Sequence, residues 1–357
     1  MKKASEANRG FYADKRVFVT GHTGFKGAWL TQILHVLGVS AYGYALPAVS
    51  GSLFDKINGE TLIGHATGDI REKYKLADAV VPFKPEIIFH LAAQAIVQDC
   101  YENPYKAYGT NVMGAVNLFE VIRMCPSVKS VVIVTSDKVY ENKGDGAVYK
   151  VGDPLGGTDP YSASKTCVEF ISESYKSSYL QTDKRTVGVA TVRASNVIGG
   201  GDHVESRLIP SILNGFANEK PVELRNAEQT RPWQSVLDAL NGYLTVGLKL
   251  YNEPLTFSSP WNIGPVKEGI CSVGDVFEKM RMYFESSAPY TIAEKFAVKE
   301  SKTLGLDIAE SVDRLEWSPE MPLDKTLYHL TDFYKRHQQG ESDYSICTGQ
   351  IRDYYAM

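Results

Sequence analysis

Arg16-Val-Phe-Val-Thr-Gly-His-Thr-Gly-Phe-Lys-Gly-Ala-Trp-Leu30 is the stretch that decides the fold of this chain. A β-branched and aromatic run ends in Gly21, Gly24 and Gly27, and a helical spacing of apolar residues begins directly after them. This order predicts a strand, a tight turn and the first turn of a helix. Glycines permit the turn, let backbone approach a pyrophosphate and let the helix pack on the strand, while unpaired N–H groups face the phosphates. The stretch therefore favours a dinucleotide site over an ordinary glycine turn.

Composition narrows the class of protein. The chain has 357 residues, a formal net charge of −4 and 43% hydrophobic residues, which suits a globular protein large enough for two domains. It carries no basic block, which argues against a nucleic-acid partner. We find neither an apolar leader nor a run long enough to span a bilayer, so we expect no membrane association and a cytoplasmic location.

Cysteine and histidine patterns indicate neither a disulfide framework nor a metal site. The five cysteines are scattered, odd in number and without a CxxC pair, so we expect them to be reduced. The seven histidines show no HExxH or facial-triad spacing. We therefore predict no metal.

Apolar runs along the first half of the chain predict a parallel sheet. Besides 17–19, they occupy 40–46, 85–94, 129–134 and 186–192, and helical patterns separate them. The regions of Thr20, Leu91, Ser136 and Ser195 then lie at the carboxyl ends of parallel strands, where open α/β sheets bind ligands. We expect an α/β protein with a Rossmann doubly wound parallel sheet over 11–195 plus about 234–265. A smaller mixed α/β substrate domain would comprise about 196–233 plus 266–357.

A tyrosine and a lysine four residues apart are candidates for proton transfer. Tyr161 and Lys165 share one face of the helix predicted to begin at Pro160. A nearby ammonium favours the phenolate and lowers a tyrosine pKa from its usual value of about 10. With Ser136 bonded to the substrate oxygen, the set would take a proton from an alcohol while NAD removes hydride. The alternative, a surface pair on a helix, loses weight because a glycine-rich turn and a serine-ended strand precede it.

Several motifs together resemble a known enzyme family. They are TGHTGFKG (20–27), GDIR (68–71), TSDKVY (135–140), DPYSASK (159–165), NVIGGGD (196–202) and RPWQ (231–234). Their combination is similar to the nucleotide-sugar 4,6-dehydratases of the extended short-chain dehydrogenase/reductase family, and among these to the CDP-glucose 4,6-dehydratases. The resemblance covers nearly the whole chain. It implies a hydro-lyase with NAD as cofactor and a CDP-hexose as substrate, acting in deoxysugar biosynthesis for lipopolysaccharide O-antigen.

The resemblance also implies which residues bind the cofactor and the sugar nucleotide. The implied cofactor contacts are Gly21, Thr23, Gly24, Phe25, Lys26, Gly27, Asp69, Ile70, Leu91, Ala92, Ala93, Thr110, Thr135, Tyr161 and Lys165. The implied substrate contacts are Gln94, Asn196, Leu208, Ile209, Arg225, Arg231 and Trp233. In relatives the helix ending near Met124 and the helix after Tyr161 commonly pair across a dimer, so a homodimer or homotetramer is expected.

Two cofactor questions stay open in the sequence. In the family, Asp69 would accept a hydrogen bond from the adenine amine, but an aspartate at this point could equally cap the following helix. The strand at 40–46 ends in Leu46-Pro47 without the acid that usually holds the ribose, and also without an arginine for a 2′-phosphate. The missing cation favours NAD over NADP.

The dipeptide after Ser136 separates reactions within the family. Epimerases carry small or apolar residues there, whereas 4,6-dehydratases carry an acid and a base, usually Asp-Glu. Here Asp137 would protonate the leaving C6 hydroxyl and Lys138 would take the C5 proton, which C4 oxidation makes acidic. A lysine can serve as a base when desolvation and nearby positive charge keep part of it neutral. A solvated Asp-Lys at a strand end is the alternative.

The chain departs from the family pattern at four positions. Ser195 and Glu316 stand where relatives have glycine, His203 where they have tryptophan, and Ser235 where they have histidine. Ser235 and His203 are expected to border the substrate cleft and therefore to bear on the base or sugar. A C4 epimerase or another sugar-nucleotide oxidoreductase is the main alternative function, and a non-catalytic NAD-binding protein is another.

Overall fold

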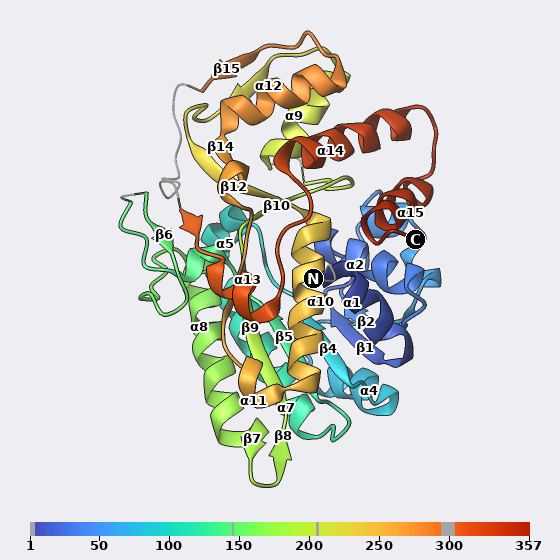
Figure 1. Ribbon diagram of the computed structural model, residues 1–357, viewed down its shortest axis with the longest axis vertical. Helices are drawn as coiled ribbons and strands as arrows, with labels where there is room; N and C mark the ends of the chain where they lie inside the picture. The colour runs from blue at the N-terminus through green and yellow to red at the C-terminus, as the bar shows by residue number, and fades with distance from the viewer. Residues whose placement is uncertain (1–3, 145, 205–206, 294–303) are drawn as a thin grey trace.

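The computed structural model describes residues 4–144, 146–204, 207–293 and 304–357 (Figure 1). Its centre is a seven-stranded sheet in the order β13-β9-β5-β4-β1-β2-β3, and every neighbouring pair is parallel. The strands are β1 (Arg16–Thr20), β2 (Ser40–Ala45), β3 (Gly64–Thr67), β4 (Ile87–His90), β5 (Ser130–Val134), β9 (Gly188–Ala194) and β13 (Trp261–Ile263). The order reverses between β1 and β4, which makes the sheet the predicted doubly wound Rossmann sheet.

Apolar side chains cover both faces of this sheet because alternate residues of a strand point to opposite sides. Val17 and Val19 of β1 join one hydrophobic cluster, and Phe18 between them joins the other. The first face packs on α2 (Phe25–Val36) and α10 (Val236–Asn252), and the second on α4 (Lys73–Phe83), α7 (Gly114–Arg123) and α8 (Pro160–Tyr175). Because both faces of the sheet are buried, polar and apolar residues do not alternate along these strands.

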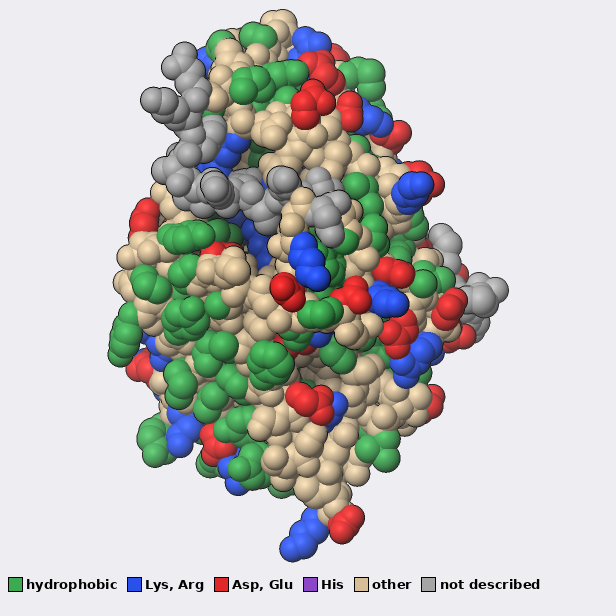
Figure 2. Space-filling model, turned by 90° about the vertical axis from the view of Figure 1, so that its left-hand side faces the viewer, with side chains coloured by type: hydrophobic (Ala, Val, Ile, Leu, Met, Phe, Trp, Pro, Cys, Tyr) green, Lys and Arg blue, Asp and Glu red, His purple; other side chains and the backbone are tan. Residues whose placement is uncertain are grey.

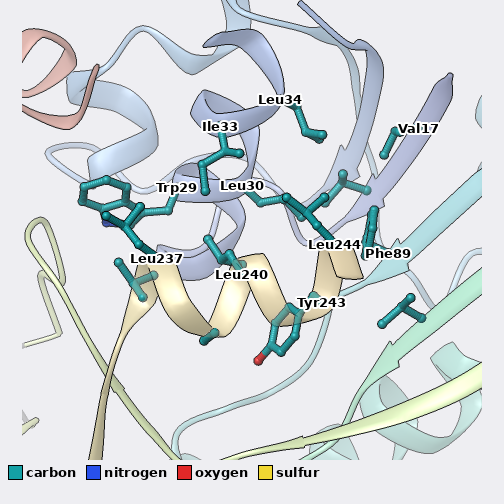
Figure 3. Packing of buried hydrophobic residues seen from close by; sticks show 14 of the residues in the cluster. Val17, Trp29, Leu30, Ile33, Leu34, Phe89, Leu237, Leu240, Tyr243 and Leu244 are labelled. Carbon is teal, nitrogen blue, oxygen red and sulfur yellow. The ribbon is translucent and has the colours of Figure 1, made fainter. Parts of the chain in front are cut away.

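Figure 3 shows the first cluster at the contact of α2 and α10. Trp29, Leu30 and Ile33 of α2 face Leu240 and Leu244 of α10, and all five are fully buried. Each large apolar side chain buried in this way contributes roughly 1.5–3 kcal/mol. The contact fixes the helix that follows the glycine-rich turn.

A second, smaller unit lies above the carboxyl ends of the strands (Figure 1). Its own hydrophobic cluster joins three helices, α9 (Leu208–Ala217), α12 (Val273–Phe284) and α14 (Leu323–Gln338). Its strands are β10 (Asn196–Ile198), β12 (Thr230–Ser235) and β14 (Ile270–Ser272) in one sheet, and β11 (Val222–Leu224) with β15 (Tyr290–Ile292) in another. The three helices supply ten of the sixteen buried members of this cluster, four each from α9 and α12 and two from α14.

The remaining elements are short or peripheral. They are α1 (Ala4–Phe11), α3 (Leu53–Lys56), α5 (Val97–Glu102), α6 (Pro104–Tyr108), α11 (Pro254–Phe257), α13 (Ala309–Leu315), α15 (Asp343–Tyr354), and the strand pairs β6 (Val148–Tyr149) with β16 (Gly305–Leu306) and β7 (Gln181–Thr182) with β8 (Arg185–Thr186). None of the described helices combines the length and the hydrophobicity that crossing a bilayer requires.

The predicted division into two domains stays a proposal. The packing favours assigning two segments of the predicted substrate domain to the domain of the central sheet. Residues of 315–321 and of α15 belong to the cluster on the sheet, not to the cluster of the second unit. Gln32 of α2 also donates to the Tyr344 carbonyl at 2.7 Å and to Thr348 Oγ1 at 2.9 Å. We therefore propose that 309–321 and 343–357 fold with the sheet, contrary to the boundary drawn from sequence at 266.

Candidate active site

The glycine-rich turn leaves the end of β1 with three glycines in three environments. Gly21 has φ +76°, and a Cβ there would lie 2.6 Å from the Ala92 backbone nitrogen. A Cβ on Gly27 would lie 2.1 Å from the Gly21 carbonyl oxygen, so the helix can pack on the turn only through glycine. Gly24 is exposed, and its added Cβ would meet only the Gly21 oxygen, at 3.5 Å. The fold needs Gly21 and Gly27, whereas the bare face of Gly24 fits a pyrophosphate approaching the backbone.

The N-terminus of α2 has backbone N–H groups that can bind an anion. Gly24 is its N-cap residue and supplies no side-chain cap, so backbone N–H groups at the helix start are left for a ligand. Thr23 donates from Oγ1 to the Leu46 carbonyl at 3.1 Å, which joins the turn to the end of β2. The residues present therefore fit the diphosphate of NAD.

Lys26 and Phe25 face the large cavity described below. The Lys26 ammonium donates to the Tyr243 hydroxyl at 3.2 Å. Desolvation lowers the pKa of Lys26 to about 8, and the nearby charge of Arg207 lowers it further. This lysine therefore loses its charge more readily than a solvated one.

Other predicted cofactor residues surround the turn. Leu91, Ala92 and Ala93 follow β4 and are half-buried, with the Leu91 amide bonded to the Thr20 carbonyl at 3.0 Å. Thr110 is half-buried in a wide helical turn, Gly109–Met113, between α6 and α7. Their contacts with NAD stay predictions.

Asp69 does not cap the following helix, so that alternative is wrong. The N-cap of α4 is Glu72, and Asp69 instead accepts from the Arg71 amide at 2.9 Å and from the Arg71 guanidinium at 2.6 Å. Ile70 beside it is buried against Gly114, where a Cβ would lie 2.7 Å from its side chain. The adenine contact expected of Asp69 and Ile70 stays a prediction.

Ser136, Asp137 and Lys138 form a tight turn directly after β5. Ser136 caps the 3-10 turn Asp137–Val139, its Oγ accepting from the Lys138 amide at 3.3 Å and donating to Asp137 Oδ1 at 2.9 Å. Ser136 and Asp137 are each only 7% exposed. Burial raises the pKa of the Asp137 carboxyl, against opposing effects of Lys138 and Ser136. The Asp137 carboxyl therefore keeps its proton to a higher pH than a solvated aspartate does.

Helix α8 carries Tyr161 and Lys165 toward this turn. Asp159 caps the helix by accepting from the Tyr161 amide at 2.9 Å, and Pro160 occupies its first position. The Lys165 ammonium donates to the Val134 carbonyl, the last of β5, at 2.9 Å. The helix is therefore attached to the strand that ends in the serine turn.

Burial dominates the protonation of this pair, contrary to the expectation that Lys165 lowers the tyrosine pKa. Burial raises the pKa of Tyr161 to about 12, partly offset by its hydrogen bond with Ser136. Burial lowers the pKa of Lys165 to about 7, and repulsion from Lys26 adds to this. The protein environment alone therefore favours a neutral tyrosine beside a largely deprotonated lysine at slightly alkaline pH.

A cavity of about 540 Å³ brings the serine turn together with residues of the second unit. Its lining includes thirteen predicted site residues: Phe25, Lys26, Thr135, Ser136, Asp137, Lys138, Tyr161, Asn196, Leu208, Ile209, Arg225, Arg231 and Trp233. Gln94 is not among the lining residues, although its neighbour Ala95 is. Its side chain donates to Asp99 at 3.1 Å, and its backbone is held by Asn111 at 2.7 Å.

Further lining residues were not predicted from sequence. Arg207 lies at the N-cap of α9 and pairs with Asp202 at 2.9 Å, and Glu223, Asn226 and Gln229 line the cavity nearby. Arg207 immediately precedes the predicted contacts Leu208 and Ile209, a position that could have indicated it.

The four departures from the family pattern occupy different environments. Ser195 lines the cavity, and its buried hydroxyl has no hydrogen-bond partner within the described part of the chain. Ser235 caps α10 by accepting from the Leu237 amide at 3.2 Å, and it does not line the cavity. His203 is exposed, and Glu316 follows α13 with φ +56°. Only Ser195 of the four borders the cavity.

The chain is similar to proteins of one enzyme family. A model of the NAD dependent epimerase/dehydratase family matches residues 17–264. A CDP-glucose 4,6-dehydratase of Salmonella typhimurium is 41% identical over 352 residues, which is 97% of this chain and 98% of that protein. UDP-glucuronic acid decarboxylase 1 of Xenopus tropicalis is 25% identical over 344 residues, covering 92% of this chain and 74% of that protein.

Solved structures agree on the fold. The dTDP-glucose 4,6-dehydratase of Bacillus anthracis, crystallised in complex with NAD, superposes with a TM-score of 0.75 at 20% identity, covering 91% of this chain and 98% of that one. The epimerase Mth375 of Methanothermobacter thermautotrophicus gives 0.79 at 19% identity, covering 94% and 96%. The predicted fold class, cofactor and resemblance are confirmed, and the chain belongs to the NAD dependent epimerase/dehydratase family.

Proposed function

We propose that the protein is an NAD-dependent hydro-lyase that converts CDP-D-glucose to CDP-4-dehydro-6-deoxy-D-glucose and water. The observation that carries the proposal is a buried aspartic acid with a raised pKa, Asp137, between Ser136 and Lys138 in the cavity that also contains Tyr161. An epimerase needs the serine and tyrosine but no additional acid and base. The similarity to a CDP-glucose 4,6-dehydratase over nearly the full length supports both the reaction and cytosine as the base of the nucleotide.

In the first half-reaction the protein removes a proton from the C4 hydroxyl. When bound, NAD supplies the redox chemistry, accepting hydride from C4 and returning it to C6 after water has left. When the sugar is bound, Ser136 turns its hydroxyl proton from Asp137 to the C4 oxygen, and Tyr161 accepts the proton of the C4 hydroxyl. Because burial raises the pKa of Tyr161 to about 12, this step needs positive charge in the site, to which Lys26 and Lys165 contribute when protonated.

In the second half-reaction the protein removes water across C5 and C6. Lys138 takes the C5 proton, the C5–C6 double bond forms, and the C6–O bond breaks as Asp137 gives its proton to the departing hydroxyl. Asp137 is suited to act as the general acid because burial raises its pKa. When hydride reaches C6, Lys138 returns a proton to C5, which completes the 4-keto-6-deoxy sugar. Lys138 is half-exposed at the cavity wall, so the proton that it took can exchange with solvent before this return.

The sugar nucleotide is proposed to span the cavity from the serine turn to the second unit. Arg207, Arg225 and Arg231 line the cavity, and arginine forks bond two oxygens of a diphosphate at once. Trp233 and Leu208 provide apolar surface for the base and ribose.

A substrate panel tests the proposal. The protein is incubated with NAD and, separately, with CDP-, dTDP-, UDP- and GDP-glucose in deuterated water, and the products are identified by mass spectrometry and NMR. We expect a 4-keto-6-deoxy sugar with deuterium at C5 from CDP-glucose, at a kcat/KM at least about tenfold above the other nucleotides, which corresponds to about 1.4 kcal/mol. A C4 epimer that keeps its C6 hydroxyl would replace this proposal by the epimerase, and cofactor binding without any turnover would indicate a non-catalytic protein.

We also propose a homodimer formed through α5 to α8, a cytoplasmic location and a role in O-antigen deoxysugar biosynthesis. Large hydrophobic side chains on these elements are exposed, among them Tyr105 (87%), Phe170 (61%) and Met113 (52%). Figure 2 shows hydrophobic side chains gathered over the lower part of the face on which α8 lies. Large apolar side chains exposed together on one face favour association with a second copy. Sedimentation of the wild type and of Phe170→Glu tests the dimer, because the charge should shift the equilibrium toward monomer.

A further inference from the structure

One buried network holds the serine turn at both of its ends. Its members are Thr135 before the turn, Tyr140 after it, and Glu169, Arg193 and Asn262 from three other elements. All five are at most 5% exposed. The catalytic proposal makes no use of any of their side chains.

A carboxylate on α8 holds the upstream end. Tyr161, Lys165 and Glu169 recur every four residues on one face of that helix. Glu169 accepts from Thr135 Oγ1 at 2.6 Å and from Thr191 Oγ1, also at 2.6 Å. Since Thr135 immediately precedes Ser136, the helix that carries the tyrosine also fixes the residue that enters the turn.

An arginine on β9 continues the network to the downstream end. Arg193 donates to Glu169 at 3.1 Å from Nε and at 2.9 Å from Nη2, so the two side chains form a bidentate ion pair. Its Nη1 donates to the Tyr140 hydroxyl at 2.9 Å, and its guanidinium lies 4.8 Å from the Tyr140 ring centroid. The same guanidinium thus connects both sides of the serine turn.

Asn262 on β13 closes the network. Its Oδ1 accepts from the Tyr140 hydroxyl at 2.6 Å, and its Nδ2 donates to the carbonyls of Tyr149 at 3.0 Å and Asp307 at 2.9 Å. The residue after the turn is therefore tied to the edge strand and to the segment leading to α13.

We propose that Glu169, Arg193 and Tyr140 are positioning residues for water elimination, holding Asp137 and Lys138 at the C5 and C6 end of the sugar. The proposal rests on the proposed function. Elimination needs an acid and a base placed at two adjacent carbons simultaneously, so it tolerates displacement of Asp137 and Lys138 poorly. Ser136, which takes part in C4 oxidation, directly follows Thr135 at the upstream end. Loosening the downstream end at Tyr140 should therefore slow elimination more than C4 oxidation.

Tyr140→Phe is the central variant, because it removes the hydroxyl that joins Arg193 to Asn262 while keeping the ring and the ion pair. Tyr149→Phe is the matched control: its ring stacks on that of Tyr140 with centroids 5.2 Å apart, but its hydroxyl bonds the Glu141 carbonyl at 3.0 Å instead of Arg193. Glu169→Gln is a stronger variant, which leaves Arg193 without its anion and destabilises the fold through that unpaired charge. The first two variants keep the ion pair and therefore keep the test valid where Glu169→Gln does not fold.

Two measurements on the full-length protein decide the matter. In single turnovers with NAD and CDP-glucose, Tyr140→Phe should slow elimination about tenfold, with reduced nicotinamide accumulating, while C4 oxidation stays within about twofold and Tyr149→Phe matches wild type. In hydrogen exchange of the protein without ligands, amides of 136–139 should exchange about tenfold faster in Tyr140→Phe and unchanged in Tyr149→Phe.

Equal slowing of both half-reactions, equal behaviour of the two tyrosine variants, or unchanged exchange at 136–139 would each overturn the positioning role. Absence of a 4-keto product from wild-type protein would instead contradict the proposed function. The exchange measurement requires no turnover, so it judges the positioning role separately.

Discussion

The two halves of the cavity are built in different ways. On the sheet side, the serine turn and the glycine-rich turn follow parallel strands that are buried in all but Arg16, and the proposed catalytic side chains are themselves buried or half-buried. On the other side, the proposed nucleotide contacts lie on β10 and β12, directly after β11 and at the start of α9, and Asn196 and Arg225 among them are exposed. The residues proposed for the chemistry thus follow strands of the main hydrophobic core. Those proposed for recognition lie on elements of the second unit, which can change with little effect on that core.

This contrast predicts that substitutions on the sheet side change rate, pH dependence and stability, and that those on the other side change substrate affinity. The following predictions test it in order of expected effect.

The largest effect is expected at the sheet-side catalytic residues. Tyr161→Phe should lower C4 oxidation by about three orders of magnitude, because it removes the group proposed to take the hydroxyl proton. Lys138→Ala should leave oxidation nearly intact and lower water loss by a similar factor. Rapid-mixing absorbance of reduced nicotinamide, with product analysis, separates the two steps. Equal loss of both steps in Lys138→Ala would contradict its assignment as the base.

Lys165→Met should abolish turnover and stabilise the folded protein. The unfolded chain keeps the Lys165 proton up to pH 10.5, whereas the folded protein releases it near pH 7. Between these values the unfolded state binds more protons, so the free energy of unfolding rises with pH, by at most about 1.4 kcal/mol per unit for one group.

Methionine does not titrate, so Lys165→Met removes the rise of the unfolding free energy with pH. It also removes the free-energy penalty of burying a charge. Below pH 7 the variant should unfold with a free energy roughly 2–4 kcal/mol above that of wild type, although turnover is lost. Denaturant unfolding from about pH 6 to pH 9 measures both quantities. A variant less stable than wild type at the lower pH would show that the buried ammonium stabilises the fold.

On the nucleotide side, Arg231→Lys should raise KM for the sugar nucleotide about tenfold and leave kcat within about twofold, because lysine keeps the charge but loses the fork. Affinity for NAD should not change. Arg281→Lys is the control, since Arg281 pairs with Glu278 on α12 outside the cavity. A fall in kcat without a change in KM would place Arg231 in the chemistry.

The smallest effect is expected far from the cavity. Glu316 holds a left-handed backbone conformation, φ +56°, and pairs with Lys249 at 2.7 Å. Glu316→Gly should stabilise the protein by about 0.5 kcal/mol, because relief of strain outweighs an exposed ion pair. Glu316→Ala keeps the strain and loses the pair, so it should destabilise. Thermal melts of both variants measure the difference, with kcat unchanged.

Local sequence signals predicted the sheet side well. The strand, glycines and helix of 16–36, the serine at the end of β5 and the shared face of Tyr161 and Lys165 all follow from short-range periodicity and turn chemistry. The placement of Gly21 and Gly27 follows from steric needs that act within the same turn.

Contacts between distant segments were not predictable. The helix α1 and the packing of α15 on α2 join ends of the chain more than 300 residues apart, as between Gln32 and Tyr344. The tyrosine pKa depends on how completely the fold excludes water, which spacing does not reveal. One overlooked signal was Arg193, a charge inside an otherwise apolar strand, because such a residue requires a buried partner.

The anchors at Thr135 and Tyr140 lie outside the dipeptide that they enclose. Positions 137 and 138 can therefore be randomised together while the surrounding framework is retained. A library confined to these two codons would ask how many reaction outcomes one scaffold can support, and it offers a compact route to redesigning the enzyme.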